Sequence, residues 1–272
     1  MTISDSKPQP PTTTTLSTRH SSLALTYVTH FPAIIKFLKH TPYDSSEFGK
    51  PQYVVSQYNN SLGENPRYNE LRYSESQYSK LAYTDITLHH VLTYMATLIK
   101  SKPHRLVLRA KELSVRTYEQ VLQFLQPLAV NYNVKLIVNH HPNLALTYNC
   151  PLQVSMAELT KLSPAIRNAI PIGVAIHSYE EAQEAVAYHS NWLVYGHVFE
   201  SRCKPGLTPR SHKILQQIID LGCPTYAIGG IYQHNWQTLP SGLAGVCIMH
   251  EAMEQTDPMQ YTTQWLHSLH TM

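Results

Sequence analysis

Short runs of apolar, β-favouring residues alternate with longer amphipathic stretches from residue 24 onward, and this alternation constrains the fold more than any other feature. Strand–helix–strand spacing of this kind predicts parallel strands joined by crossover helices. Eight such runs predict an α/β fold that closes into a (β/α)₈ TIM barrel, in preference to an open doubly wound sheet. The predicted strands are 24–29, 105–109, 134–138, 151–154, 172–176, 192–196, 224–228 and 243–249, and the predicted helices are Thr117–Asn131, Met156–Arg167, Tyr179–Tyr188, Pro209–Leu221 and a last one from about Glu251 to Leu269.

Two stretches do not follow the barrel pattern. Residues 1–20 are rich in Pro, Thr and Ser, which predicts a disordered N-terminal tail ahead of one barrel domain over 21–272. Residues 40–85 are rich in Tyr, Ser, Asn and Gln and follow neither helical nor strand periodicity. We expect this stretch to be an insertion between the first strand and the first helix. It is either a disordered polar loop or a segment that orders as a lid or partner-binding arm.

Composition narrows the class of protein. The chain has 21 Lys and Arg residues against 18 Asp and Glu, a net charge of +3 that does not indicate a nucleic-acid or membrane-surface partner. It contains no secretory signal pattern and no apolar run of about 18 residues. Four cysteines lie far apart without a CxxC pair, which argues against a disulfide framework or zinc site. We therefore expect a soluble cytoplasmic protein with reduced thiols.

In a barrel of this type, functional residues lie at the carboxyl ends of the strands. Gly229 and Gly230 follow the seventh predicted strand, and a helix is expected to begin just after Met249 and His250. Glycines and a helix N-terminus together favour binding of a phosphate group, although a Gly-Gly pair can also form a simple turn. We expect three cations at the same mouth: Arg109, Lys111 and Lys204. They would suit a second anionic group on the ligand, such as a carboxylate or diphosphate. The alternative is that they are only solvated charges at the rim.

His177 is the candidate proton carrier, because it ends the fifth strand and an imidazole can give and take a proton near neutral pH. A histidine at that position can equally be a packing residue. Asn139 ends the third strand and Ser155 the fourth, so both are expected to contact a ligand. Gln153 or Ser155 would then orient the ligand's ring.

The stretch from Arg105 to Ala252 resembles the thiamin phosphate synthase/TenI family. The motifs LVLRAKELS, IVNHHPNLAL, GVAIHSYEEA, YGHVFESRCKPGL and YAIGGI occur in the family's order and at its spacing. The resemblance implies a TIM barrel that binds a phosphorylated thiazole. Synthases of this family join a pyrimidine diphosphate to a thiazole phosphate and hold Mg²⁺ with two aspartates. TenI proteins of the tautomerase type isomerise a carboxythiazole phosphate to its aromatic form without metal.

Several positions depart from the synthase pattern. Val107 stands in place of the synthase glutamine, His140 replaces one metal aspartate, and Glu158 stands where the second would fall. Such a pair is a poor Mg²⁺ site, since that ion prefers hard oxygen ligands. GHVFES at 196–201 and IHS at 176–178 resemble the tautomerase branch, in which this histidine is the proposed acid/base.

Three interpretations follow from the resemblance. The first is a tautomerase that needs no metal or cofactor: His177 moves the proton, Gly229, Gly230 and the backbone at 249–250 hold the phosphate, and a cation holds the carboxylate. The second is a catalytically idle relative that binds a phosphorylated ligand in a regulatory role. The third is a synthase that uses His140 and Glu158 in an altered metal site. Association into a homo-oligomer is left open.

Overall fold

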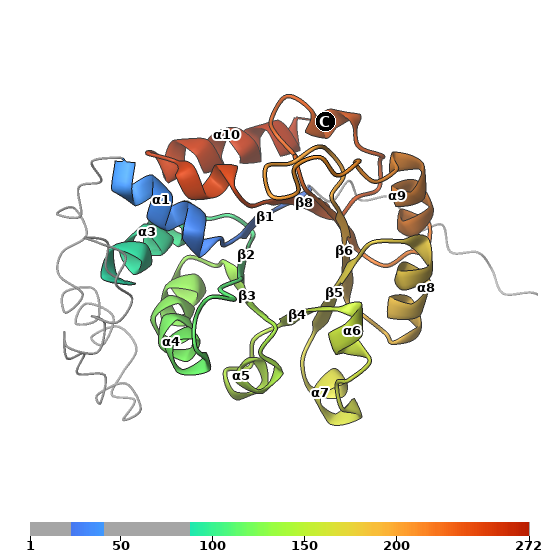
Figure 1. Cartoon of the computed structure of the whole chain (residues 1–272), viewed down its shortest axis with the longest axis horizontal. Helices are drawn as coiled ribbons and strands as arrows, with labels where there is room; N and C mark the ends of the chain where they lie inside the picture. Colours follow the sequence, from blue (N-terminus) through green and yellow to red (C-terminus); the bar gives the residue numbers. More distant parts are fainter. Residues whose placement is uncertain (1–22, 41–87, 272) are drawn as a thin grey trace, which may run out of the picture.

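The computed structural model describes residues 23–40 and 88–271, and these form a closed barrel of eight parallel strands. Each strand pairs with the next, and β1 pairs with β8. Figure 1 shows the strands as a central ring with the helices outside it. The strands are β1 (Ala24–Val28), β2 (Arg105–Leu108), β3 (Lys135–Asn139), β4 (Leu152–Ser155), β5 (Ile172–Ile176), β6 (Trp192–Gly196), β7 (Thr225–Ile228) and β8 (Gly245–Ile248). The predicted fold class and all eight predicted strands are confirmed.

Helices of the outer layer return the chain from the carboxyl end of each strand to the amino end of the next. Serine side chains cap several of them: Ser114 accepts from the N–H of Thr117, and Ser178 accepts from the N–H of Glu181. The helices are α1 (Phe31–His40), α3 (Leu88–Lys100), α4 (Val115–Asn131), α5 (Pro142–Thr147), α6 (Met156–Leu159), α7 (Pro164–Ala169), α8 (Tyr179–Ala187), α9 (His212–Ile219) and α10 (Pro258–His270), with 3₁₀ turns η3 (Trp236–Thr238) and η4 (Glu251–Glu254).

Three details differ from the sequence-based expectations. The stretch 156–167 is divided into α6 and α7, because Ser163 caps a new helix that has Pro164 in its first turn. The last helix is divided in the same way into η4 and α10, with Asp257 as the cap and Pro258 in the first turn. A helix, α1, also follows β1 directly, so the polar stretch from 40 to 85 leaves the end of α1 and not the end of β1.

Two predictions fall on residues that the structure does not describe. The expected tail at 1–20 lies wholly outside the described residues, and almost all of the stretch at 40–85 does too. The single-domain boundary at 21–272 therefore stays a prediction.

Apolar side chains fill the barrel and the layer between strands and helices. A separate cluster occupies the inside of the barrel and includes Val107, Ile137 and Val194. At the amino ends of the strands, this cluster meets a buried cation. The guanidinium of Arg105 lies 4.4 Å from the ring centroids of both Trp192 and Tyr226, and only 8% of this residue is exposed. Contact with the two aromatic faces offsets the free-energy cost of burying this charge.

All four cysteines are free thiols, as expected. No helix among the described residues is long and apolar enough to cross a membrane.

Candidate functional site

His177 directly follows β5, at the end of the barrel where the carboxyl ends of the strands meet. Its backbone is held on two sides, because its N–H donates to the Glu181 carboxylate and its carbonyl accepts from Arg210, both at 2.5 Å. Its Nδ1 lies 3.0 Å from the carbonyl oxygen of Gly196. A carbonyl only accepts, so Nδ1 carries the proton and Nε2 of the neutral ring is the basic nitrogen.

The Nε2 atom of His177 has no hydrogen-bond partner among the described residues, and the residue is exposed. The ring is thus fixed through one nitrogen and open to a ligand through the other. The alternative of a buried packing histidine does not fit this exposure.

Gly229 and Gly230 follow β7 in left-handed conformations, with φ of 101° and 67°. A Cβ atom on Gly229 would lie 2.5 Å from Cβ of His197, and one on Gly230 would lie 2.2 Å from the carbonyl oxygen of Glu200. Both positions therefore need glycine for conformation and for close approach of the loop after β6. Neither backbone N–H is bonded to a described residue, so both remain available to an anion.

Two of the three predicted cations, Arg109 and Lys204, lie within electrostatic range of one side chain, the Cys203 thiol. Arg109 follows β2, where its backbone exchanges hydrogen bonds with the Thr29 side chain at 2.8 and 2.9 Å. Its Nη1 is buried without a partner among the described residues. Arg109 and Lys204 both lower the pKa of the Cys203 thiol. Lys111 is exposed and shares no contact with this group in the described part of the chain.

Asn139 is buried at the end of β3 and forms a junction with two neighbouring segments. Its N–H donates to the Tyr118 hydroxyl at 3.0 Å, and that hydroxyl donates to the carbonyl of Leu108 at 2.6 Å. Its Nδ2 donates to the carbonyl of Gln153 at 2.9 Å, whereas Oδ1 has no partner among the described residues. This oxygen is itself buried, so the structure does not present it to a ligand.

Ser155 does not have a free hydroxyl. Its backbone N–H and its Oγ both donate to Oε2 of Glu158, at 2.8 and 2.7 Å, and so form the capping box of α6. The second oxygen of Glu158 lies 2.5 Å from Nδ1 of His140. Burial tends to raise the pKa of Glu158, but the bonds from Ser155 and His140 outweigh it and hold this pKa below its usual value.

The contacts of Glu158 and His140 bear on whether these two residues could bind Mg²⁺ as the synthases do. Both oxygens of Glu158 already have protein partners, and His140 supplies an imidazole where an oxygen ligand is needed. The described residues contain no group of three His, Cys, Asp or Glu side chains arranged to hold a metal ion. The residues at these two positions therefore do not fit Mg²⁺.

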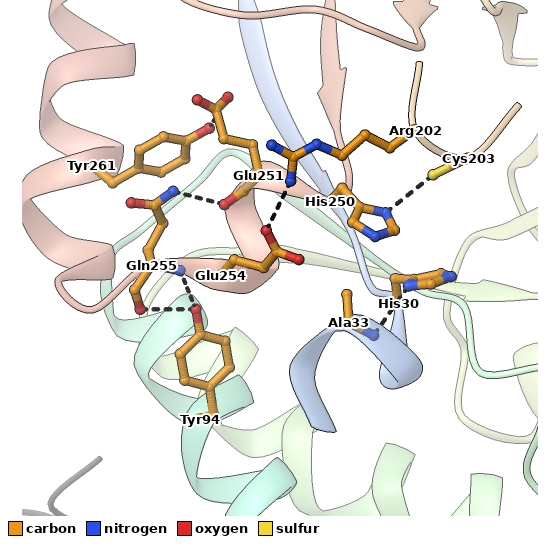
Figure 2. A network of polar contacts seen from close by, with 10 residues as sticks. All are labelled: His30, Ala33, Tyr94, Arg202, Cys203, His250, Glu251, Glu254, Gln255 and Tyr261. Carbon is orange, nitrogen blue, oxygen red and sulfur yellow. Dashed lines mark hydrogen bonds and ion pairs between the residues drawn. The ribbon is translucent and has the colours of Figure 1, made fainter. Parts of the chain in front are cut away.

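A further cluster at the mouth was not predicted from the sequence (Figure 2). His250 lies between β8 and η4, and η4 is a 3₁₀ turn and not the expected α-helix. Its Nδ1 lies 3.1 Å from Sγ of Cys203, and its ring centroid is 4.7 Å from that of His30. The strand-end rule applied to β1 would have selected His30, but no sequence pattern indicated Cys203. Met249 lies beside His250 and is half-buried.

A family model described as thiamine monophosphate synthase matches residues 82–252. The chain belongs to the thiamine monophosphate synthase family. Its match to the thiamine-phosphate synthase of Halalkalibacterium halodurans is 30% identical over 156 residues, covering 55% of this chain and 74% of that protein. The match to the thiamine-phosphate synthase of Herpetosiphon aurantiacus is 29% identical over 188 residues, covering 64% and 87%.

A solved structure agrees with the fold. The thiamine phosphate pyrophosphorylase from Pyrococcus furiosus superposes with a TM-score of 0.61 at 16% identity, covering 91% of this chain and 95% of that one. The family match over residues 82–252 confirms the resemblance to the family. The names of the relatives favour the synthase interpretation over the tautomerase one, and they do not distinguish a TenI branch.

Proposed function

We propose that this member of the thiamine monophosphate synthase family is a tautomerase that moves a proton on a phosphorylated carboxythiazole. The observation that carries the proposal is the state of His177: Nδ1 is bonded to the carbonyl of Gly196, and Nε2 is free at the mouth of the barrel. A group fixed in this way can accept a proton from one ring position and return it to another.

The rest of the mouth supports binding of a ligand with two anionic ends. The free N–H groups of Gly229 and Gly230, with the backbone at 249–250, suit the phosphate. Arg109 follows β2 and Lys204 lies in the loop between β6 and α9, and both suit the carboxylate because both act on the same Cys203 thiol. Holding both ends fixes the ring beside one imidazole, and such positioning lowers the barrier to proton transfer. Formation of an aromatic ring makes the proton shift favourable, so no second substrate is required.

The second candidate is a thiamine-phosphate synthase, which the names of the relatives favour. Against it stands the His140–Glu158 pair, whose contacts leave Glu158 without a free oxygen for Mg²⁺. The two candidates differ in a measurable way, because a synthase releases pyrophosphate and a tautomerase releases nothing.

The test compares the wild-type protein with His177→Gln and with His267→Gln, an exposed histidine on α10 away from the mouth. Aromatisation of the non-aromatic carboxythiazole phosphate is followed by ultraviolet absorbance with EDTA present. We expect His177→Gln to lower kcat by roughly 10²–10⁴-fold, the usual contribution of a general acid–base, and His267→Gln to leave it unchanged.

Two outcomes would contradict the proposal. Pyrophosphate release that requires Mg²⁺, measured with a pyrimidine diphosphate and the thiazole phosphate, would identify the synthase. Binding of the thiazole phosphate without either reaction would favour an idle, ligand-binding relative.

A further inference from the structure

Cys203 and His250 form a thiol–imidazole pair at the mouth of the barrel (Figure 2). Cys203 lies in the loop between β6 and α9, and His250 lies between β8 and η4. A second contact joins the same two segments, because Nη1 of Arg202 lies 3.4 Å from the Glu254 carboxylate. The pair therefore has a defined geometry: two adjacent side chains of one loop contact the segment after β8.

The arrangement places a nucleophile and a base within reach of each other. Sγ of Cys203 is 3.1 Å from Nδ1 of His250, within reach for proton transfer. The His250 ring packs against the His30 ring, at 38° between their planes. His30 is itself held, because its Nδ1 accepts from the backbone N–H of Ala33 at 3.2 Å. Packing against the held His30 ring thus limits the positions that the His250 ring can take.

The electrostatic surroundings set the resting state of the thiol. Partial burial raises the pKa of Cys203, and Glu254 acts in the same direction. Arg109 and Lys204 lower this pKa but do not outweigh burial. The thiol is therefore protonated at neutral pH, and it donates to Nδ1 of His250 when that ring carries its own proton on Nε2. A thiolate forms only when His250 takes the proton, so reactivity depends on that histidine.

The other three cysteines lack this arrangement. Burial raises the pKa of Cys150 to about 11 and that of Cys247 to about 12. Cys223 is half-buried, and burial raises its pKa too. Its thiol donates to the carbonyl oxygen of Ser190 at 3.4 Å, and a carbonyl is not a base that can remove the proton. Cys203 is the exposed cysteine, and it alone among the four contacts a base.

We propose that Cys203 is a covalent modification site that reacts with small-molecule disulfides. Sγ of Cys203 passes its proton to Nδ1 of His250 and attacks one sulfur of the disulfide. A new S–S bond forms at Cys203 as the old one breaks, and the departing thiolate takes the proton back from His250. Cys203 is oxidised to a mixed disulfide, and the departing sulfur is reduced to a thiol.

The position of the modified group predicts its effect on ligand binding. An adduct on Sγ lies beside Arg109 and Lys204, the cations proposed to hold an anionic end of the ligand. This consequence rests on the proposed function, whereas the modification itself does not. We expect the modified protein to bind the carboxythiazole phosphate more weakly, and a reducing thiol to restore binding.

The experiment treats the full chain with oxidised glutathione and follows the intact mass, with peptide mapping to locate the adduct. The proteins are the wild type, Cys203→Ser, His250→Gln and the matched control Cys223→Ser. We expect one adduct in the wild type and in Cys223→Ser, and none in Cys203→Ser. His250→Gln should react at least roughly tenfold more slowly, since general base assistance is lost.

Two results would overturn the proposal: an adduct that forms on Cys223 as fast as on Cys203, or an unchanged rate in His250→Gln. Circular dichroism of each variant shows whether it is folded. If His250→Gln does not fold, the order of labelling of Cys203 and Cys223 in the wild type decides. Neither readout requires catalysis, so failure here is distinguishable from failure of the tautomerase proposal.

Discussion

Replacement of Gly230 by alanine tests whether the loop after β6 is packed against the glycines after β7. The new Cβ would lie 2.2 Å from the carbonyl oxygen of Glu200 and 2.8 Å from Cβ of Phe199. Backbone atoms cannot yield as a flexible side chain can, so this overlap should cost about 1–3 kcal/mol. The positive φ of 67° adds about 1–2 kcal/mol for a residue with a side chain. Together they predict a loss of about 2–5 kcal/mol in the free energy of unfolding.

Gly222→Ala is the matched control for this prediction. Gly222 has a similar φ of 78°, but an added Cβ would meet no atom within 4 Å. It should therefore lose only the conformational cost of about 1–2 kcal/mol. The measurement is urea unfolding followed by circular dichroism for both variants and the wild type. Equal destabilisation of the two variants would refute the argument, because it would mean that the loop at 199–200 moves aside at no cost.

Three further predictions concern the barrel itself. Arg105→Ala should lower the free energy of unfolding by about 2–4 kcal/mol in urea titrations, because it removes cation–π contacts and packing. No loss of stability would show that the aromatic rings do not stabilise the cation. Tyr118→Phe should cost about 1–3 kcal/mol in the same assay, because the carbonyl of Leu108 loses its donor; a neutral result would mean that water replaces the hydroxyl. Burial, and secondly the nearby His270, hold the pKa of His104 below its ordinary 6.5, and Nδ1 of the neutral ring accepts from the N–H of Leu25. The contribution of His104 to the free energy of unfolding is therefore present above pH 6.5 and is lost as the pH falls below that value. The Tm of His104→Gln should vary less over this pH range than the Tm of the wild type.

The strands could be predicted from sequence because each is a short, buried run bounded by turn residues. Every predicted strand overlaps the observed one, and β5 and β6 agree at both ends. The short helices were harder to predict, because α6 and α7 are separated by only four residues and apolar periodicity does not register so small a break. The cap and proline at 163–164 are the local signal for that break.

The site could be predicted only in part, for physical reasons that differ from residue to residue. Strand ends are fixed by the barrel, so His177, Gly229 and Gly230 could be placed at the mouth from sequence. Ser155 was expected to face a ligand, but the pattern Ser-x-x-Glu from 155 to 158 is that of a capping box, and the structure contains this capping box.

The contact between Cys203 and His250 joins positions 47 residues apart. It depends on the path of an irregular loop, and no periodicity or spacing predicts such a path.

The pairing of β1 with β8 joins the first and last strands of the barrel, with Ala24 opposite Gly245 and Tyr27 opposite Ile248. His30 follows β1 and His250 follows β8, so their ring contact bridges the line along which the barrel closes. Contacts of such long sequence separation depend on closing a loop of most of the chain. A partly folded barrel in which β1 has not yet paired with β8 therefore lacks the ring contact between His30 and His250.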